Sequence, residues 1–240
     1  MRSSLAATRD ADLTSPTRQM PRTGMSTNQQ VALIVPPVLI VSMYGAFRYL
    51  TAVLGFPAGY LTAFALYWVG WCLIVPAAIL RRDRLLSLFT RSTVRFTKLS
   101  AITQLLLWWP IAFPLAFSFV PRIASTPLVI VATSVLLGVI IGVTEEILWR
   151  GMFVTLFPDR LWLNTVYPSI TFGLWHLCPL SVLSSPYPGG TMSFAAYSIA
   201  LGLSYAYYAR STGSIRWCTV SHCVHDALGL GAFAYSQWLM

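Results

Sequence analysis

Long apolar runs limit what this chain can fold into more than any other feature of its sequence. Several windows hold about 20 mostly apolar residues, the length that crosses a hydrocarbon core of about 30 Å as an α-helix. The clearest is residues 128–144, LVIVATSVLLGVIIGVT. The alternating pattern of a membrane β-barrel is absent. The chain is therefore predicted to be all-α, a polytopic transmembrane helical bundle.

The composition agrees with a membrane protein. Hydrophobic residues make up 56% of the chain and charged residues only 10%, whereas soluble domains carry about 25% charged residues. The formal net charge of +9 could suggest a nucleic-acid partner. However, the basic residues lie at the ends of the apolar runs, which is how membrane topology is set. We therefore expect contact with the lipid bilayer and no nucleic-acid binding.

Seven helices are expected, with boundaries uncertain by a few residues. Their ranges are 30–50, 58–80, 99–120, 127–157, 161–183, 191–210 and 215–237. The fourth is predicted to begin with Thr126 as its N-cap and Pro127 in the first helical position. At about 46 Å, this helix exceeds the membrane core, so it must tilt, bend or protrude.

The two ends of the chain are expected to differ. Residues 1–28 are polar and without an apolar stretch, so they are predicted to be a disordered tail, with Met25 as an alternative translation start. Residues 29–240 would form one transmembrane domain, whose motif-bearing core spans about 100–238. Arginines gather before the first helix and between the second and third. The positive-inside rule then places the N-terminus in the cytoplasm of a multi-pass protein, in the plasma membrane if the host is prokaryotic.

Glutamates and histidines are scarce and lie late in the chain. The only two glutamates, Glu145 and Glu146, end an apolar run, and the three histidines are His176, His222 and His225. An ionisable group in a membrane span costs about 3 kcal/mol on insertion scales, so it usually faces a polar interior and marks a functional site. The cluster predicts a buried reaction centre.

The glutamate pair forms the first motif, with Arg150. Glu146 and Arg150 are four residues apart, so they share a helix face and can pair. Glu145 points about 100° away and is free to act as a base. The alternative is a Glu–Arg pair that extends toward the cytoplasmic interface and has no catalytic role.

Two further motifs have the same four-residue spacing, Phe172 with His176 and His222 with Asp226. A lone buried histidine is more often structural, but two beside an intramembrane glutamate pair favour a site. Glu145 and His176 would lie about 20 and 22 Å from the cytoplasmic ends of their helices. His222 would lie only about 10 Å in, so either the last helix starts deeper in the bundle or the site is reached obliquely.

Metal binding is an open alternative. No HExxH motif occurs, so the chain is not a conventional zinc protease. Glu145, His176, His222 and either Asp226 or His225 could nevertheless form the carboxylate and imidazole set that zinc accepts. The site would then require either no cofactor or a divalent metal such as zinc.

In this order, the three motifs resemble the CPBP family of intramembrane proteases. That family contains the type II CAAX prenyl endopeptidases and bacteriocin-processing or immunity proteins. Its pattern reads EExxxR, then FxxxH, then HxxxN or HxxxD, on successive core helices, and the resemblance covers about residues 100–238. What the resemblance implies is endoproteolysis within the bilayer, on a membrane-anchored or membrane-associated protein or peptide.

The resemblance also implies roles for individual residues. Glu145 would activate a water with help from His176, while His222 and Asp226 would stabilise the tetrahedral oxyanion. The supporting residues would be Glu146, Arg150 and Phe172. Asparagine is frequent where this chain has Asp226, and an amide can donate to an oxyanion whereas an ionised carboxylate repels it. Asp226 would therefore be protonated, orient His222, or bind a metal.

Two other functions compete with proteolysis. A proton-coupled transporter would use the same glutamates and histidines as a relay, but no pair of broken helices in matching halves is visible. A family member without proteolytic activity could act as an immunity factor or membrane chaperone.

Overall fold

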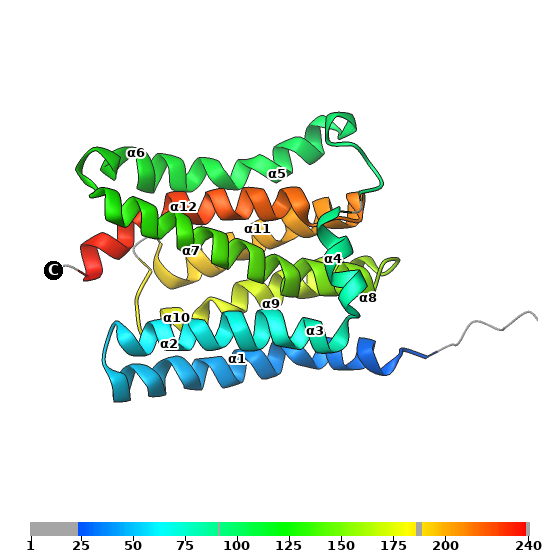
Figure 1. The fold of residues 1–240 in the computed structure, drawn as a ribbon, viewed down its shortest axis with the longest axis horizontal. Helices are drawn as coiled ribbons and strands as arrows, with labels where there is room; N and C mark the ends of the chain where they lie inside the picture. Colours follow the sequence, from blue (N-terminus) through cyan, green and yellow to red (C-terminus); the bar gives the residue numbers. More distant parts are fainter. Residues whose placement is uncertain (1–23, 91, 186–188, 239–240) are drawn as a thin grey trace, which may run out of the picture.

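The computed structural model describes residues 24–90, 92–185 and 189–238, which form a bundle of helices without a strand (Figure 1). In chain order its α-helices are α1 (Thr27–Leu54), α2 (Ala58–Leu66), α3 (Val75–Ile79), α4 (Arg82–Thr90), α5 (Ala101–Pro114), α6 (Val120–Arg122), α7 (Leu128–Glu146), α8 (Phe153–Leu156), α9 (Tyr167–Trp175), α10 (Leu177–Leu180), α11 (Gly190–Thr212) and α12 (Arg216–Trp238). The predicted all-α bundle is confirmed. The short helix α4 was not predicted.

Several of these helices join end to end through π-helical or 3-10 turns. We call such a continuous helical run, or a single long helix, a rod. Four rods in the described part of the chain are long and apolar enough to cross a membrane. They are Thr27–Leu54, Ala58–Ile79, Ala101–Ser125 and Leu128–Leu156. Together with their composition, these rods make the chain an integral membrane protein.

The start of α1 is set by a capping box. The Ser26 hydroxyl accepts a hydrogen bond from the Gln29 backbone N–H, and the Gln29 side chain accepts one from the Ser26 N–H. These contacts satisfy amide groups that the first helical turn leaves without partners. Of the predicted tail, residues 1–23 lie outside the described residues, and α1 already begins at Thr27.

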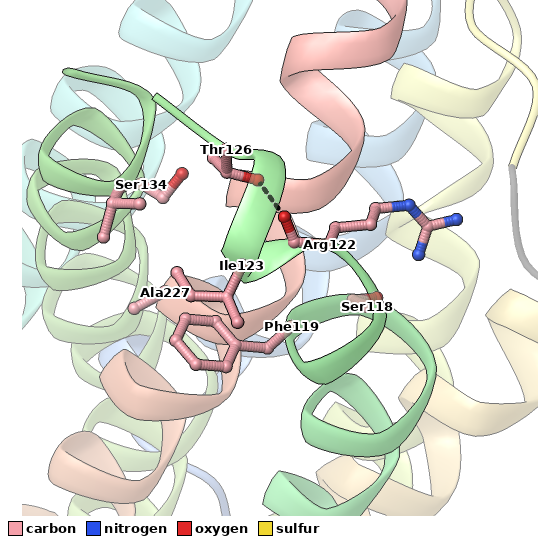
Figure 2. Close-up of a pocket in the computed structure, with 8 residues that line it drawn as sticks. Ser118, Phe119, Arg122, Ile123, Thr126, Ser134 and Ala227 are labelled. Carbon is pink, nitrogen blue, oxygen red and sulfur yellow. Dashed lines mark hydrogen bonds between the residues drawn. The ribbon is translucent and has the colours of Figure 1, made fainter. Parts of the chain in front are cut away.

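The predicted N-cap of the fourth long helix is wrong. Helix α7 begins at Leu128, and its cap position is Pro127, without a side-chain capping bond. Thr126 instead donates to the Arg122 carbonyl at 2.8 Å, which closes the preceding turn (Figure 2). A threonine hydroxyl bonds readily to the carbonyl four residues back, and this local bond competes with capping. Thr126 and Arg122 also line a small cavity of about 10 Å³, which has room for about one water.

The longest rod, Leu128–Leu156, changes its winding in its C-terminal third. A π-helical stretch, Ile147–Met152, follows directly after Glu146 and contains Arg150. Such wide turns are rare and often occur at functional sites.

Helix α12 packs along α7 so closely that their backbones touch (Figure 1). A Cβ atom at Gly138 would lie 2.7 Å from the Ala227 nitrogen, and one at Gly142 would lie 2.7 Å from the Cys223 nitrogen. The two glycines are four residues apart and therefore share a helix face, in the small-xxx-small arrangement of close membrane helices. This contact brings the glutamate motif of α7 beside the histidine motif of α12.

The start of α12 lies inside the protein, beneath α4. The Ser214 hydroxyl and the Ile215 N–H both donate to the Leu88 carbonyl of α4, at 3.0 and 2.9 Å. Ser214 and Ile215 are both buried. Because α12 begins below this cover, its second turn already reaches the level of the glutamates. This accounts for the short distance between the start of the helix and His222.

Candidate active site

One cavity of about 160 Å³ lies among α2, α7, α9, α10, α11 and α12. Its wall includes all four residues predicted to be catalytic, Glu145, His176, His222 and Asp226. Most of the remaining wall is apolar or aromatic, including Tyr60, Phe64, Trp175, Leu180 and Phe194. The cavity therefore surrounds a few ionisable groups with a low-dielectric lining.

Glu146 and Arg150 form a buried ion pair next to the cavity wall. Arg150 Nη1 lies 2.9 Å from Glu146 Oε1, and the two side chains are 1% and 0% exposed. The Arg150 guanidinium also lies over the Phe172 ring, 4.4 Å from its centre, and faces Tyr205 at 5.5 Å. The pair is enclosed by protein, which rules out a solvated pair at an interface.

His222 connects this ion pair to the cavity. Its Nδ1 lies 2.8 Å from Glu146 Oε1, so the imidazole donates there to a carboxylate that Arg150 already neutralises. Its Nε2 lies 3.7 Å from Glu145 Oε2 and 3.5 Å from Asp226 Oδ2. The contact with Glu146 was not predicted from the sequence. It holds the ring so that Nε2 is directed to the two carboxyl groups of the cavity.

His176 is held by its own helix. Its Nδ1 lies 2.8 Å from the Phe172 carbonyl, and since a carbonyl only accepts, Nδ1 carries the hydrogen. The Phe172 and His176 rings also meet edge to face, with centres 4.7 Å apart. In the neutral imidazole, Nε2 is then an acceptor, and His176 lines the cavity.

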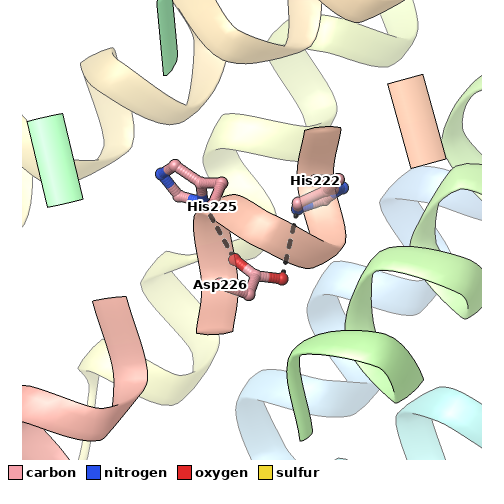
Figure 3. A group of neighbouring side chains, drawn as sticks. All are labelled: His222, His225 and Asp226. Atoms are coloured by element: carbon pink, nitrogen blue, oxygen red, sulfur yellow. Dashed lines mark hydrogen bonds and ion pairs between the residues drawn. The ribbon is translucent and has the colours of Figure 1, made fainter. Parts of the chain in front are cut away.

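Asp226 lies between two histidines (Figure 3). Its Oδ1 is 3.0 Å from His225 Nδ1, and its Oδ2 is 3.5 Å from His222 Nε2. His225 in turn contacts the Tyr197 hydroxyl at 3.1 Å, and both line the cavity. Tyr197 was missed in the sequence, where no spacing connects α11 with the last motif.

Three possible metal ligands, His222, His225 and Asp226, have donor atoms within 4.8 Å of one another (Figure 3). This group includes His225 rather than His176. Both nitrogens of His225 and the Nδ1 of His222 already take part in hydrogen bonds. Zinc ligands need a free lone pair about 2.1 Å from the ion, so these contacts would have to rearrange before a metal could bind.

A serine nucleophile is not prepared at this site. Ser221 precedes His222 in α12, but its hydroxyl donates to the Leu107 carbonyl at 2.6 Å and contacts the Tyr205 hydroxyl at 3.0 Å. It is fully buried away from the cavity. Ser198 lines the cavity, but its hydroxyl donates to the Phe194 carbonyl at 2.9 Å. The carboxyls and imidazoles that line the cavity suit the activation of water.

Residues 127–228 match the family model described as "Type II CAAX prenyl endopeptidase Rce1-like". The matched segment contains all three motifs and is narrower than the expected range of about 100–238, because it leaves out α5 and α6. Neither the curated proteins nor the solved structures gave a match. The match shows an Rce1-like domain in residues 127–228, and the order of the motifs and their meeting at one cavity support membership of the CPBP family.

Proposed function

We propose that the protein is an intramembrane endopeptidase that hydrolyses a peptide bond in a membrane-anchored protein or peptide. The observation that carries this proposal is the single cavity shared by Glu145, His176, His222 and Asp226. Its volume of about 160 Å³ is enough for several waters, since about 10–15 Å³ on this measure holds one. The match of residues 127–228 to the Rce1-like model supports a protease of the CAAX type, while the substrate and the mechanism are our inference.

Glu145 is the general base in this proposal. Its carboxylate takes a proton from a water that also donates to the Nε2 of His176, which is a free acceptor because Nδ1 bonds to Phe172. The water oxygen attacks the carbonyl carbon of the substrate, and the carbon–nitrogen bond then breaks. The proton held by Glu145 passes to the leaving amine. Both chemical steps thus use one carboxyl group, first as base and then as acid.

His222 supplies the donor for the oxyanion. Glu146 and Arg150 fix its Nδ1, so Nε2 faces the cavity between Glu145 and Asp226. When both ring nitrogens carry hydrogens, the Nε2–H can donate to the developing negative charge. Such preorganised donors act most strongly where water is excluded.

Membrane orientation is part of the proposal. We expect all seven long helices to cross the bilayer, with α4 at the cytoplasmic end. The exposed basic residues Arg81, Arg84, Arg95 and Lys98 lie in and around α4. The start of α1 lies at the same end of the bundle (Figure 1). By the positive-inside rule this end, with the N-terminus, is cytoplasmic.

The test uses the purified protein in liposomes with a panel of membrane-anchored reporter peptides, each with and without a prenyl group. Cleavage is followed by mass spectrometry, and proton-driven uptake is measured in the same vesicles. We expect cleavage by the parent protein and none by Glu145→Ala. Gradient-driven uptake without cleavage would support a transporter instead. The absence of both activities would favour an immunity or chaperone role.

A further inference from the structure

Tyr197 of α11 and His225 of α12 line the cavity but have no role in the mechanism above. Their rings lie nearly parallel, at 22°, with centres 5.8 Å apart. His225 is outside the three sequence motifs, and its side chain is only 14% exposed. The Tyr197 hydroxyl contacts His225, and His225 in turn contacts Asp226.

The hydrogens in this chain of contacts can be counted. The Tyr197 hydroxyl donates to the Pro110 carbonyl at 2.8 Å. A phenol has one hydrogen, so in its 3.1 Å contact with His225 Nε2 the Tyr197 oxygen accepts and Nε2 carries the hydrogen. The other ring nitrogen, Nδ1, lies 3.0 Å from Asp226 Oδ1.

This contact with Asp226 needs one more hydrogen. A His225 ring with hydrogen only on Nε2 presents a lone pair at Nδ1, and an ionised carboxyl group also presents only lone pairs. The two would repel at 3.0 Å. A hydrogen therefore lies between them, bonded either to Nδ1 or to Oδ1. In both arrangements the His225–Asp226 pair has no net charge.

The neutral pair matters because of where the second oxygen of Asp226 lies. Oδ2 is 3.5 Å from His222 Nε2, the donor that faces the cavity. A full negative charge at this place would repel an oxyanion bound by His222. An asparagine is neutral there by its own chemistry. An aspartate needs a neighbour that contributes the hydrogen.

We propose that His225, held by Tyr197, is a positioning residue that neutralises Asp226 and fixes the direction of its carboxyl group, so that an aspartate can stand beside the oxyanion. This inference rests on the proposed function for its role in catalysis. The hydrogen count stands apart from that function and is measurable without any substrate.

The first test is spectroscopic. The chain has three histidines, so ¹⁵N-histidine labelling in detergent gives three pairs of ring signals, which His225→Phe assigns. We expect either a protonated Nδ1 on His225, or an unprotonated Nδ1 with a carboxylic-acid infrared band that disappears in Asp226→Asn. An unprotonated Nδ1 without that band would overturn the proposal, whether or not the protein cleaves peptides.

The second test is a double-mutant cycle with cleavage as the readout. His225→Phe should lower kcat about tenfold in the parent protein with little change in KM, but less than about twofold in the Asp226→Asn background. The reason is that asparagine has no charge for His225 to cancel. Equal losses in both backgrounds would show a merely structural role and overturn the proposal.

Tyr197→Phe is the matched variant, because it keeps the aromatic ring and removes only the hydroxyl. It should lower kcat in the same direction and to a smaller extent, again only while residue 226 is an aspartate. If the parent protein cleaves no peptide of the panel, the proposed function fails, and the spectroscopic test still decides the state of His225.

Discussion

The two halves of this protein bury different kinds of side chain. In residues 24–126, the buried polar side chains are Thr103 and Ser118, and the core consists of aliphatic and aromatic groups such as Phe47 and Tyr67. Residues 127–228 bury a much more polar set, including Glu145, Glu146, Arg150, Asn164 and His222. Three of the four rods with membrane length and apolarity belong to the first half. The first half thus resembles a scaffold, and the second contains the candidate chemistry.

The difference shows how hydropathy should be interpreted in such a chain. Helices α11 and α12 are long, but they do not meet the hydropathy criterion that the outer rods satisfy. Several of their polar side chains, such as Ser204, Ser221 and His222, bond to protein partners inside the bundle. Hydropathy alone does not separate scaffold from site, because the most apolar rod, Leu128–Leu156, carries Glu145 and Glu146. The ionisable residues within apolar helices identify the site.

The largest effect is expected from Glu145→Ala, which should abolish cleavage while the protein still inserts and folds. Glu145 faces the cavity and is not part of the Glu146–Arg150 pair. The control is Asp83→Ala in the first half, whose carboxyl group is exposed. Peptide cleavage in liposomes measures both variants. Full activity of Glu145→Ala would exclude Glu145 as the base.

Next come Glu146→Gln and Arg150→Leu, which should lower stability as well as activity. Each leaves a buried partner without its counter-charge, a loss of about 3–5 kcal/mol. The exposed pair of Arg81 and Asp83 provides the contrast, because surface pairs contribute little. Thermal unfolding in detergent should show lower melting temperatures for the first two variants and no change for Asp83→Ala. Unchanged melting of Glu146→Gln and Arg150→Leu would mean that water reaches this pair.

A smaller loss is expected for Gly142→Ala. The added methyl group would press on the Cys223 backbone of α12, and such overpacking costs about 1–3 kcal/mol. It should also separate Glu146 from His222 and lower kcat. Gly45→Ala in α1 is the matched control, since no atom lies within 4 Å of its added Cβ. Equal melting temperatures for the two variants would contradict the close contact of α7 and α12.

Metal removal is expected to have the smallest effect. The imidazole nitrogens of the His222, His225 and Asp226 group are largely engaged in hydrogen bonds. Exhaustive chelation should therefore leave the cleavage rate unchanged. Stoichiometric zinc that is lost together with activity, and restores activity when returned, would contradict this expectation. The water would then be bound to the metal, with Glu145 as base or ligand.

The sequence predicts much of this arrangement because two of its signals are local. Apolar runs indicate the seven long helices, and the four-residue spacing places Arg150 beside Glu146 and Asp226 near His222. The bond between His222 and Glu146 joins residues 76 positions apart, and no local spacing indicates it. The glycine pair of α7, four residues apart, is a local signal of the close contact with α12.

Helix α4 was missed for a different reason. Its arginines are typical of a cytoplasmic loop. They outweigh, in the sequence pattern, the few apolar residues that pack inward, such as Leu88. The Leu88 carbonyl then accepts the bonds that set the start of α12. The depth of the last motif could not be predicted without this helix.

Hydrolysis in ¹⁸O-labelled water tests most directly whether Glu145 acts on water in this cavity. The parent protein in liposomes would cleave a reporter peptide in a single turnover. Mass spectrometry would then locate the label. We predict one ¹⁸O atom in the new carboxyl group of the peptide and none in the Glu145 side chain. Label in the Glu145 carboxyl group would instead show a covalent acyl-enzyme and contradict a role as general base.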